Sequence, residues 1–284
     1  MKKLALIFAI FLFLLMFLSI QAQAQDASAR EAIKETALNY IDGAHAGSAA
    51  RMEQAVHPEL CKVTLQTIPQ TEKTVLRKAG SSRLIQVVGA QATVLAEEKR
   101  HIQVEILDVL QGLAMVRATS AKFWDYLQIA DIDGEWKIIN VLWINNPNQE
   151  KSTHTSADET AIKETALNYI EGSFSGDAER MEKALHPELN KVIPVKVRQT
   201  GKTMLDKMGA ALLIEGTRAK MGMVPVDERN IELNILDVKN NIAMVKVLSS
   251  RYYDYLQVAK FGDSWKIVNV LWVMNPDAPR PNRK

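Results

Sequence analysis

The chain has 284 residues, with 35 Lys+Arg, 33 Asp+Glu and a formal charge of +2. That length predicts about two domains of 100–200 residues each. The charge surplus comes from Lys2 and Lys3, because residues 1–24 contain no acid and the remainder balances at 33 basic and 33 acidic side chains. A neutral body argues against a nucleic-acid groove, which needs many Lys and Arg residues. One cysteine, Cys61, excludes an intramolecular disulfide and a four-cysteine metal site.

Residues 1–24 have the pattern of a signal peptide. Lys2 and Lys3 precede an unbroken apolar run over residues 4–18, and Ala22-Gln23-Ala24 follows as a small-x-small cleavage site. The apolar run is shorter than the roughly 20 residues that a membrane-spanning helix needs. We therefore expect cleavage after Ala24 and a secreted or periplasmic protein with no membrane attachment afterwards.

The body of the chain consists of two tandem copies of one domain. The ten residues of 32–41 recur unchanged as 161–170, an offset of 129, and about half of positions 32–147 match their partners without insertion or deletion. A period this long exceeds the roughly 20–50 residues of a solenoid repeat, so a whole domain has been duplicated. The predicted segments are the signal peptide 1–24, a first domain 25–148, a linker 149–156, a second domain 157–278 and a tail 279–284.

Each copy is predicted to begin with helices. Ser28 with Glu31, and Ser156 with Glu159, have the spacing of a capping box ahead of the first helix. A short second helix is expected around Ala50–Val56, ending at His57 because Pro58 disfavours helix at the residue before it. A third helical stretch is expected over about Thr74–Val88.

The rest of each copy is predicted to be extended. Alternating apolar residues over 102–106 indicate a strand with one buried face. Turn signals at Gln111-Gly112 and Asp133-Gly134 separate the strands expected over 113–119, 122–130 and 136–144. Helices followed by a bent antiparallel sheet make an α+β fold and exclude a parallel doubly wound sheet.

The order of motifs resembles a known superfamily. Tyr-Ile-Asp/Glu-Gly, then Arg-Met-Glu, His-Pro-Glu-Leu-x-Lys and a final Gly-x-Trp-Lys-Ile hairpin are similar to the nuclear-transport-factor-2-like proteins. Asp-Tyr-Leu-Gln followed by Trp-Lys-Ile-x-Asn-Val-Leu-Trp resembles the putative lumazine-binding family, close to the SnoaL-like polyketide cyclases. The resemblance implies two cone-shaped rolls with helices over a curved sheet and an apolar pocket between them. It also implies that the copies pair through their sheets as a pseudo-dimer.

His57 and His186 occupy the same place in the two copies and are the first candidate catalytic residues. A histidine near a pocket could serve as a general base, because its ordinary pKa is close to neutral. The favoured interpretation is structural: a helix-terminating histidine in a His-Pro turn, hydrogen-bonded to the last free carbonyls of the helix. His-x-Glu supplies too few ligands for a metal site, so we expect no metal and no cofactor.

Asp125 and Asp254 are the other catalytic candidates, each followed in a strand by Tyr126 or Tyr255. Neighbouring strand residues face opposite sides. The favoured arrangement is a solvent-facing Asp beside a core Tyr, and the alternative is a carboxylate inside an apolar pocket, where it could move a proton.

Aromatic residues supply the candidate ligand contacts. Tyr40 and Tyr169 lie on the apolar face of the first helix, which the resemblance places over the cavity. Trp143 and Trp272 lie at matched positions on the last strand, where core packing is favoured over ligand stacking. The six candidate ligand-binding residues are Tyr40, Tyr169, Tyr126, Tyr255, Trp143 and Trp272.

These observations favour an exported protein that binds a small hydrophobic or aromatic ligand without catalysis. One alternative is an isomerase, dehydratase or cyclase-like enzyme that acts by acid–base catalysis on a small carbonyl compound. A second alternative is a structural interaction module, and fold alone does not decide between them.

Overall fold

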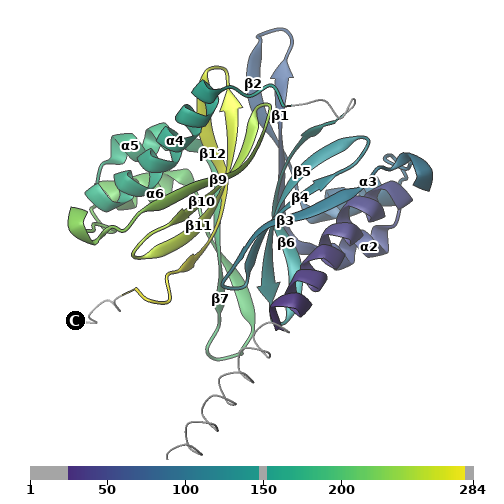
Figure 1. Cartoon of the computed structure of the whole chain (residues 1–284), viewed down its shortest axis with the longest axis horizontal. Coiled ribbons are helices and arrows are strands. Elements are labelled where there is room, and N and C mark those ends of the chain that lie inside the picture. The colour runs from purple at the N-terminus through teal and green to yellow at the C-terminus, as the bar shows by residue number, and fades with distance from the viewer. Residues whose placement is uncertain (1–24, 147–151, 279–284) are drawn as a thin grey trace, which may run out of the picture.

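The computed structural model describes residues 25–146 and 152–278, and the two parts share one architecture (Figure 1). The predicted signal peptide and tail lie outside the described residues, as does most of the predicted linker. In each half two helices come first, followed by two strands, a third helix and a four-stranded meander. The fold is α+β and occurs twice in tandem, as the sequence predicts.

The helices lie on the outer side of each half (Figure 1). The first helix covers residues 25–46. The others are α2 (Ala49–Ala55), α3 (Ser81–Gly89), α4 (Ser156–Ser175), α5 (Ala178–Ala184) and α6 (Ala210–Arg218), with short 3-10 turns η1 (Glu97–Lys99) and η2 (Val226–Glu228). Among the described residues, no helix has the combined length and apolarity that crossing a membrane requires.

The helix starts differ from the prediction. In the second copy the capping box uses Thr155 and Asp158, one residue earlier than predicted, because the Thr155 hydroxyl accepts from the Asp158 amide and the Asp158 carboxylate accepts from the Thr155 amide. Ser28 lies inside the first helix, which already covers residue 25. The spacing rule therefore located both helices but not their caps.

Two glycines let the first two helices of each copy approach closely. A Cβ on Gly43 would lie 3.0 Å from the Cβ of Arg51, and one on Gly172 would lie 3.1 Å from the backbone nitrogen of Met181. The arginine at this crossing is tied to the first helix, since Arg51 donates to Asp42 at 2.5 Å and Arg180 forms an ion pair with Glu171 at 2.6 Å. This contact uses the glycine and the arginine, which both copies retain.

Each half contains a six-stranded mixed sheet in the order β2-β1-β6-β5-β4-β3 or β8-β7-β12-β11-β10-β9. The first sheet consists of β1 (Val56–Ile68), β2 (Lys73–Ala79), β3 (Gln103–Leu110), β4 (Leu113–Thr119), β5 (Phe123–Ile132) and β6 (Glu135–Asn145). The second consists of β7 (Leu185–Lys196), β8 (Thr203–Met208), β9 (Glu232–Lys239), β10 (Ile242–Leu248), β11 (Tyr252–Phe261) and β12 (Ser264–Met274).

The sheet corrects two predictions. Residues 74–79 form strand β2 and not part of a helix, because they pair with β1 through the register Leu65↔Leu76. The predicted antiparallel sheet has one parallel pair, β1 with β6. His57 and Pro58 consequently lie at the start of β1 and not in a turn after a helix.

Tight turns and bulges shape the meander. Gln111 and Gly112, and Asp133 and Gly134, all have positive φ, which suits the two-residue turns that join twisted antiparallel strands. The predicted turns are therefore confirmed. A bulge interrupts the pairing of β5 with β6 after Gln128, and its counterpart follows Gln257 in the second sheet. Bulges increase twist and bend a strand, so both sheets curve at the same place.

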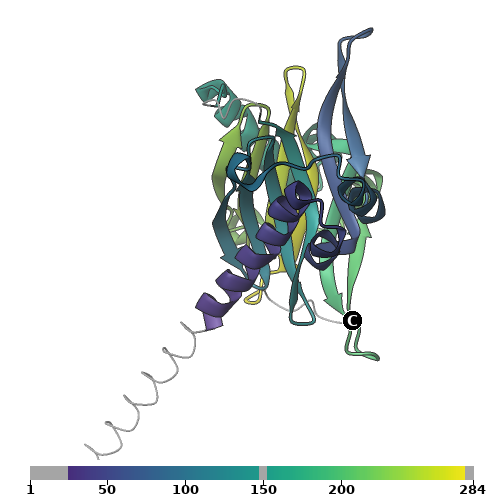
Figure 2. The same cartoon turned by 90° about the vertical axis from the view of Figure 1, so that its right-hand side faces the viewer.

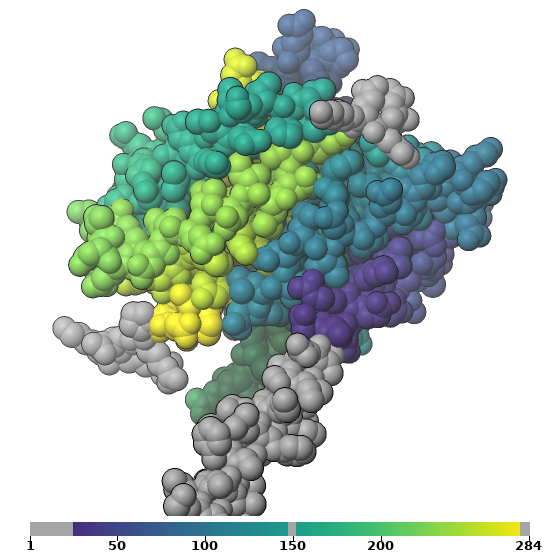
Figure 3. Space-filling view, viewed as in Figure 1, coloured from purple at the N-terminus to yellow at the C-terminus, as the bar shows by residue number. Residues whose placement is uncertain are grey.

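The two sheets face each other across the middle of the molecule, with the helices outside (Figures 1 and 2). Figure 3 shows the two halves meeting along a broad seam. A shared core fills this space and includes Tyr126 and Met115 from one sheet with Tyr255 and Met244 from the other. Ion pairs recur under the 129-residue offset. They are Arg117–Asp237 with Lys246–Asp108, and Lys207–Glu59 with Lys78–Glu188. The domains thus form an intramolecular pair with pseudo-twofold symmetry.

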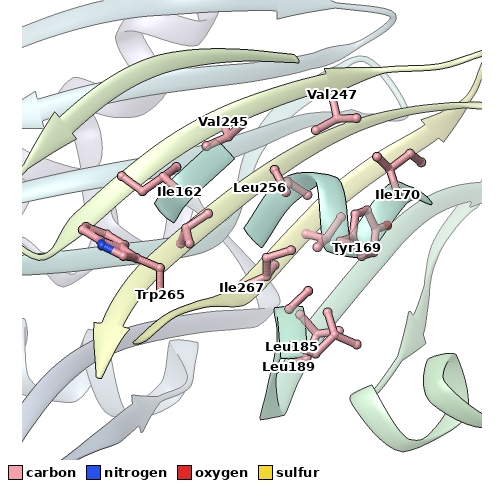
Figure 4. Packing of buried hydrophobic residues seen from close by; sticks show 14 of the residues in the cluster. Ile162, Tyr169, Ile170, Leu185, Leu189, Val245, Val247, Leu256, Trp265 and Ile267 are labelled. Atoms are coloured by element: carbon pink, nitrogen blue, oxygen red, sulfur yellow. The ribbon is translucent and has the colours of Figure 1, made fainter. Parts of the chain in front are cut away.

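A second core lies on the other side of each sheet, under the helices. Figure 4 shows it in the second domain, where Ile162, Tyr169 and Ile170 of α4 meet Val245, Leu256 and Ile267 of the sheet. Trp265 packs at the left of this layer in the view, and Leu185 and Leu189 lie at its lower side. A tyrosine hydroxyl inside such an apolar layer needs a polar partner.

Candidate functional site

Each domain contains a cavity between its helices and the outer face of its sheet. The first has a volume of about 240 Å³ and the second about 280 Å³. Tyr40, Lys62 and Trp143 line the first, and their counterparts Tyr169, Lys191 and Trp272 line the second. The matched lining shows that the duplication preserved the interior face of the cavity.

A buried Tyr–Lys–Asp cluster forms the polar end of the first cavity. The Tyr40 hydroxyl donates to Asp125 Oδ1 at 2.6 Å, and the ammonium of Lys62 donates to the same oxygen at 2.7 Å and also to the Tyr40 oxygen. Three elements position these groups: the first helix, β1 and β5. The carboxylate side chain is only 1 % exposed and that of Lys62 12 % exposed, so the ion pair is shielded from solvent.

The second cavity repeats this cluster. Tyr169 donates to Asp254 Oδ1 at 2.8 Å, and Lys191 Nζ donates to Asp254 Oδ1 at 2.6 Å and to the Tyr169 oxygen. Here the lysine side chain is 5 % exposed and the carboxylate is fully buried. Such a pair is costly to desolvate and is tolerated only with good geometry and further hydrogen bonds, which the tyrosine supplies.

Burial dominates the electrostatics of the cluster. It raises the pKa of Tyr40 and of Tyr169 well above the ordinary tyrosine value, and the adjacent carboxylate adds to that effect. It lowers the pKa of Lys62 and Lys191, while the paired Asp opposes the change. The tyrosines therefore remain protonated donors at neutral pH.

A tryptophan covers each lysine. Lys62 Nζ lies 4.6 Å from the ring centroid of Trp143, and Lys191 Nζ lies 4.2 Å from that of Trp272, within the range of a cation–π interaction. An ammonium has three N–H donors, and the Tyr and Asp oxygens take two of them. The Tyr and Asp oxygens therefore leave one N–H of each ammonium for another acceptor, next to a tryptophan that also lines the cavity, which suits a ring carrying a hydrogen-bond acceptor.

The structure places the candidate aspartates differently from the favoured interpretation. Asp125 and Asp254 are 0 % and 1 % exposed, so a solvent-facing carboxylate is wrong. Each points to the cavity side and its neighbouring tyrosine points the other way. The reason is that on this side of the sheet the ammonium of the lysine neutralises the carboxylate and the tyrosine hydroxyl donates a hydrogen bond to it.

Tyr126 and Tyr255 lie in the core between the sheets and line neither cavity. Tyr255 donates to Asp108 Oδ2 of the other domain at 2.6 Å. Of the six aromatic residues predicted to contact a ligand, four line the cavities, Tyr40 with Trp143 and Tyr169 with Trp272. Tyr126 and Tyr255 lie away from these cavities.

His57 and His186 lie outside both cavities. Each Nδ1 accepts a hydrogen bond of 3.1 Å from the backbone amide two residues later, Glu59 or Glu188. Burial lowers the pKa of both imidazoles. His186 also packs on the ring of Phe261, with 4.6 Å between the ring centroids. The predicted bond to the last helix carbonyls is wrong, because each imidazole instead accepts from a backbone amide at the start of its strand, and neither ring is within the Tyr–Lys–Asp cluster.

Sequence reasoning missed the lysines as site residues. Lys62 and Lys191 end the His-Pro-Glu-Leu-x-Lys motif, and they are retained although the residue before them changes from Cys61 to Asn190. The retention of this lysine in both copies, beside a residue that changed, was the available signal. Among residues 25–146 and 152–278, no group of three or more His, Cys, Asp or Glu could hold a metal ion.

Comparison with known proteins gives a family for both halves. A family model described as "Putative lumazine-binding" matches residues 28–144 and again residues 157–273. A comparison with curated proteins finds no match.

Solved structures similar to the chain include three NTF2-like proteins of unknown function. The protein from Silicibacter pomeroyi is 18 % identical, with 43 % of this chain and 100 % of that chain covered and a TM-score of 0.36. The one from Shewanella baltica is 19 % identical, covering 44 % and 99 % with a TM-score of 0.34. The one from Methylobacillus flagellatus is 19 % identical, covering 44 % and 98 % with a TM-score of 0.35.

Proposed function

Because the chain belongs to the putative lumazine-binding family in both of its halves, we propose that it is a tandem binding protein for small aromatic molecules and that it does not catalyse a reaction. The observation that carries the proposal is the paired cavity with its Tyr–Lys–Asp end and tryptophan wall. Ligand sites are typically concave and apolar with a few convergent polar groups. The family description names lumazine, a two-ring heteroaromatic compound, as the kind of ligand to test.

The cavity size fits this class of ligand. A cavity of about 150 Å³ lined by apolar side chains can hold one benzene ring. Volumes of about 240 and 280 Å³ therefore suit a molecule of one or two rings. Such a ring could stack on Trp143 or Trp272 while a carbonyl oxygen accepts from the lysine.

The geometry of the aspartates favours binding over catalysis. A general base must reach the proton that it removes, in a suitable protonation state. Asp125 Oδ1 and Asp254 Oδ1 each already accept hydrogen bonds from a lysine and a tyrosine. The other oxygen, Oδ2, of each carboxylate is buried and has no hydrogen-bond partner among the described residues. Protonation of the carboxylate would leave the buried ammonium of the lysine without its counter-charge, and this favours a binding role over proton abstraction.

The acid–base enzyme is the second candidate, and the lowered pKa of the two lysines favours it. A neutral lysine could take a proton from a small carbonyl compound. Turnover of a molecule found bound to the purified protein, lost in Lys62→Met with Lys191→Met, would replace the binding proposal with this one.

Native mass spectrometry of the protein purified from its own host tests the proposal, followed by titration with lumazine. Ala79 and Gly216 line the first and second cavity, and both are partly exposed. Ala79→Phe and Gly216→Phe should each remove one of two binding sites. No co-purified molecule, together with no lumazine binding that these variants alter, would favour a structural interaction module.

Export is part of the same proposal and rests on the sequence of residues 1–24. Expression in a Gram-negative host followed by N-terminal sequencing of the periplasmic fraction should give a chain that starts at Gln25. An intact N-terminus in the cytoplasm would contradict it.

A further inference from the structure

The two cavities differ in the charge of their lining, although their interior faces match. Arg77, Lys78 and Arg83 line the first cavity. The offset of 129 gives Asp206, Lys207 and Leu212 as their counterparts, and of these only Leu212 lines the second cavity. One basic residue has thus become acidic and another apolar.

Two of these basic side chains are available to a ligand. Lys78 donates to the backbone oxygen of Glu188 at 2.6 Å and pairs with its carboxylate at 3.2 Å, so it is occupied by the domain interface. Arg77 and Arg83 are exposed, and in the described part of the chain neither has an ion-pair or hydrogen-bond partner. Both guanidiniums therefore remain free to bind an anion.

Among the described residues, no acid in the first cavity offsets the two arginines. Asp125 is the one acid of this part of the chain that lines the cavity, and Lys62 neutralises it at 2.7 Å. In the second cavity Lys191 is the one charged residue among the described lining residues, and Asp254 neutralises it at 2.6 Å. The first cavity consequently carries a positive rim over a neutral interior, whereas the second is neutral throughout and lined by Met208, Leu212 and Met221.

We propose that the two cavities bind different ligands: the first binds a small aromatic monoanion and the second binds a neutral aromatic molecule. This inference rests on the proposed binding function. The ring of the monoanion occupies the apolar interior, and its acid group lies at the rim with Arg77 and Arg83. Arginine binds carboxylates and phosphates through paired N–H donors, which makes it well suited to this task.

Isothermal titration with 2-naphthoate and 2-naphthamide tests the proposal, because the two probes share one ring system and differ in charge. Wild-type protein should bind 2-naphthamide at two sites of similar affinity. It should bind 2-naphthoate about tenfold more tightly at one site than at the other, the size expected for one or two charge-assisted hydrogen bonds.

Exchanging residues between the copies provides matched variants. Arg83→Leu and Arg77→Asp each place the second domain's residue in the first, and each should weaken the tight 2-naphthoate site about five- to tenfold while leaving 2-naphthamide unchanged. Leu212→Arg should create a second tight 2-naphthoate site. All three positions are exposed, and an unchanged circular dichroism spectrum and thermal unfolding midpoint report that the fold of each variant is intact.

The possible failures are distinguishable. If both probes bind but 2-naphthoate affinity does not respond to Arg83→Leu, Arg77→Asp or Leu212→Arg, the charge assignment is overturned and the binding function stands. If neither probe binds to any form of the protein, both proposals are overturned together.

Discussion

Asn190 of the second domain donates a hydrogen bond of 2.8 Å to the side-chain oxygen of Asn140 in the first domain. Asn140 in turn donates to Gln128, whose amide donates to the backbone oxygen of Tyr255 across the interface. This chain of bonds connects the bulge of the first sheet to strands β7 and β11 of the second. The pseudo-twofold symmetry relates it to an equivalent chain of bonds through Asn269 and Gln257. That second chain lacks one hydrogen bond.

The incomplete half involves Cys61. It occupies the position of Asn190 in the first domain, and in the described residues the oxygen of its expected partner, Asn269, is buried without a hydrogen-bond partner. We predict that Cys61→Asn supplies the missing donor and raises the free energy of unfolding by about 1 kcal/mol, the typical net value of one hydrogen bond. Urea denaturation would measure the change.

Two variants serve as controls for this prediction. Cys61→Ser removes the thiol but has a side chain too short to reproduce the asparagine contact, and it should not stabilise the protein. Asn190→Cys makes both halves incomplete and should lower stability by about 1–3 kcal/mol, since a buried oxygen loses its donor. Equal stability of Cys61→Asn and Cys61→Ser would contradict the inferred symmetry.

The buried ion pairs at the cavity ends lead to a second prediction. Lys191→Met leaves Asp254 buried with only Tyr169, and removing one partner of a buried pair costs about 3–5 kcal/mol. The double variant Lys191→Met with Asp254→Asn removes both charges and should recover a large part of that loss. Chemical denaturation of the two variants checks the order.

The first domain provides the comparison for this effect. The side chain of Lys62 is more exposed than that of Lys191, 12 % against 5 %. Lys62→Met should therefore cost less than Lys191→Met, because solvent can compensate part of the unpaired charge. A double variant no more stable than Lys191→Met would show that the ion pair is not the source of the loss.

The third prediction is that His57 and His186 do not take part in ligand binding. His57→Ala with His186→Ala should leave lumazine affinity within about twofold, because neither ring lines a cavity. Each substitution removes one local hydrogen bond and should lower the free energy of unfolding by about 1 kcal/mol. A loss of binding or of turnover without unfolding would return the histidines to the list of functional residues.

The sequence predicted the fold from repetition and alternation, and it failed where tertiary pairing decides structure. Residues 74–79 have no strong periodicity, and they become strand β2 only because β1 lies beside them. The parallel pairing of β1 with β6 could not be read from local patterns, since it joins segments about 80 residues apart. Turns such as Asp133-Gly134 were predictable because their backbone conformation favours those residue types.

The site was predicted only in part for the same reason. The apolar face of the first helix, which carries Tyr40, could be recognised from its helical periodicity. Its partner Asp125 was expected to face solvent. The face that a strand residue takes depends on what covers it, and here the cover is the ammonium of Lys62. A buried charge looks like a surface charge in sequence until its counter-ion is located.

Acid stability gives the last prediction, through Asp158. Its hydrogen bond from Lys260, assisted by the Thr155 backbone and Trp265, holds the pKa of this carboxyl well below its ordinary value. A carboxyl with a depressed folded pKa contributes stability above its unfolded pKa of about 3.9, and this contribution is lost as the pH falls below that value. The first domain has Ala29 at the matched position, so the effect belongs to the second domain alone.

Urea denaturation between pH 7 and pH 2 measures this contribution. Asp158→Asn should be less stable than wild type at pH 7, and the difference should shrink as the pH falls below about 4, because Asp158 of the unfolded wild type then binds a proton that the folded state does not. Lys260→Gln keeps the carboxyl but removes its main donor, so the acid transition of that variant should begin at a higher pH than in wild type. Parallel stability curves for wild type and Asp158→Asn across this range would show that the carboxylate of Asp158 does not contribute to the stability of the second domain.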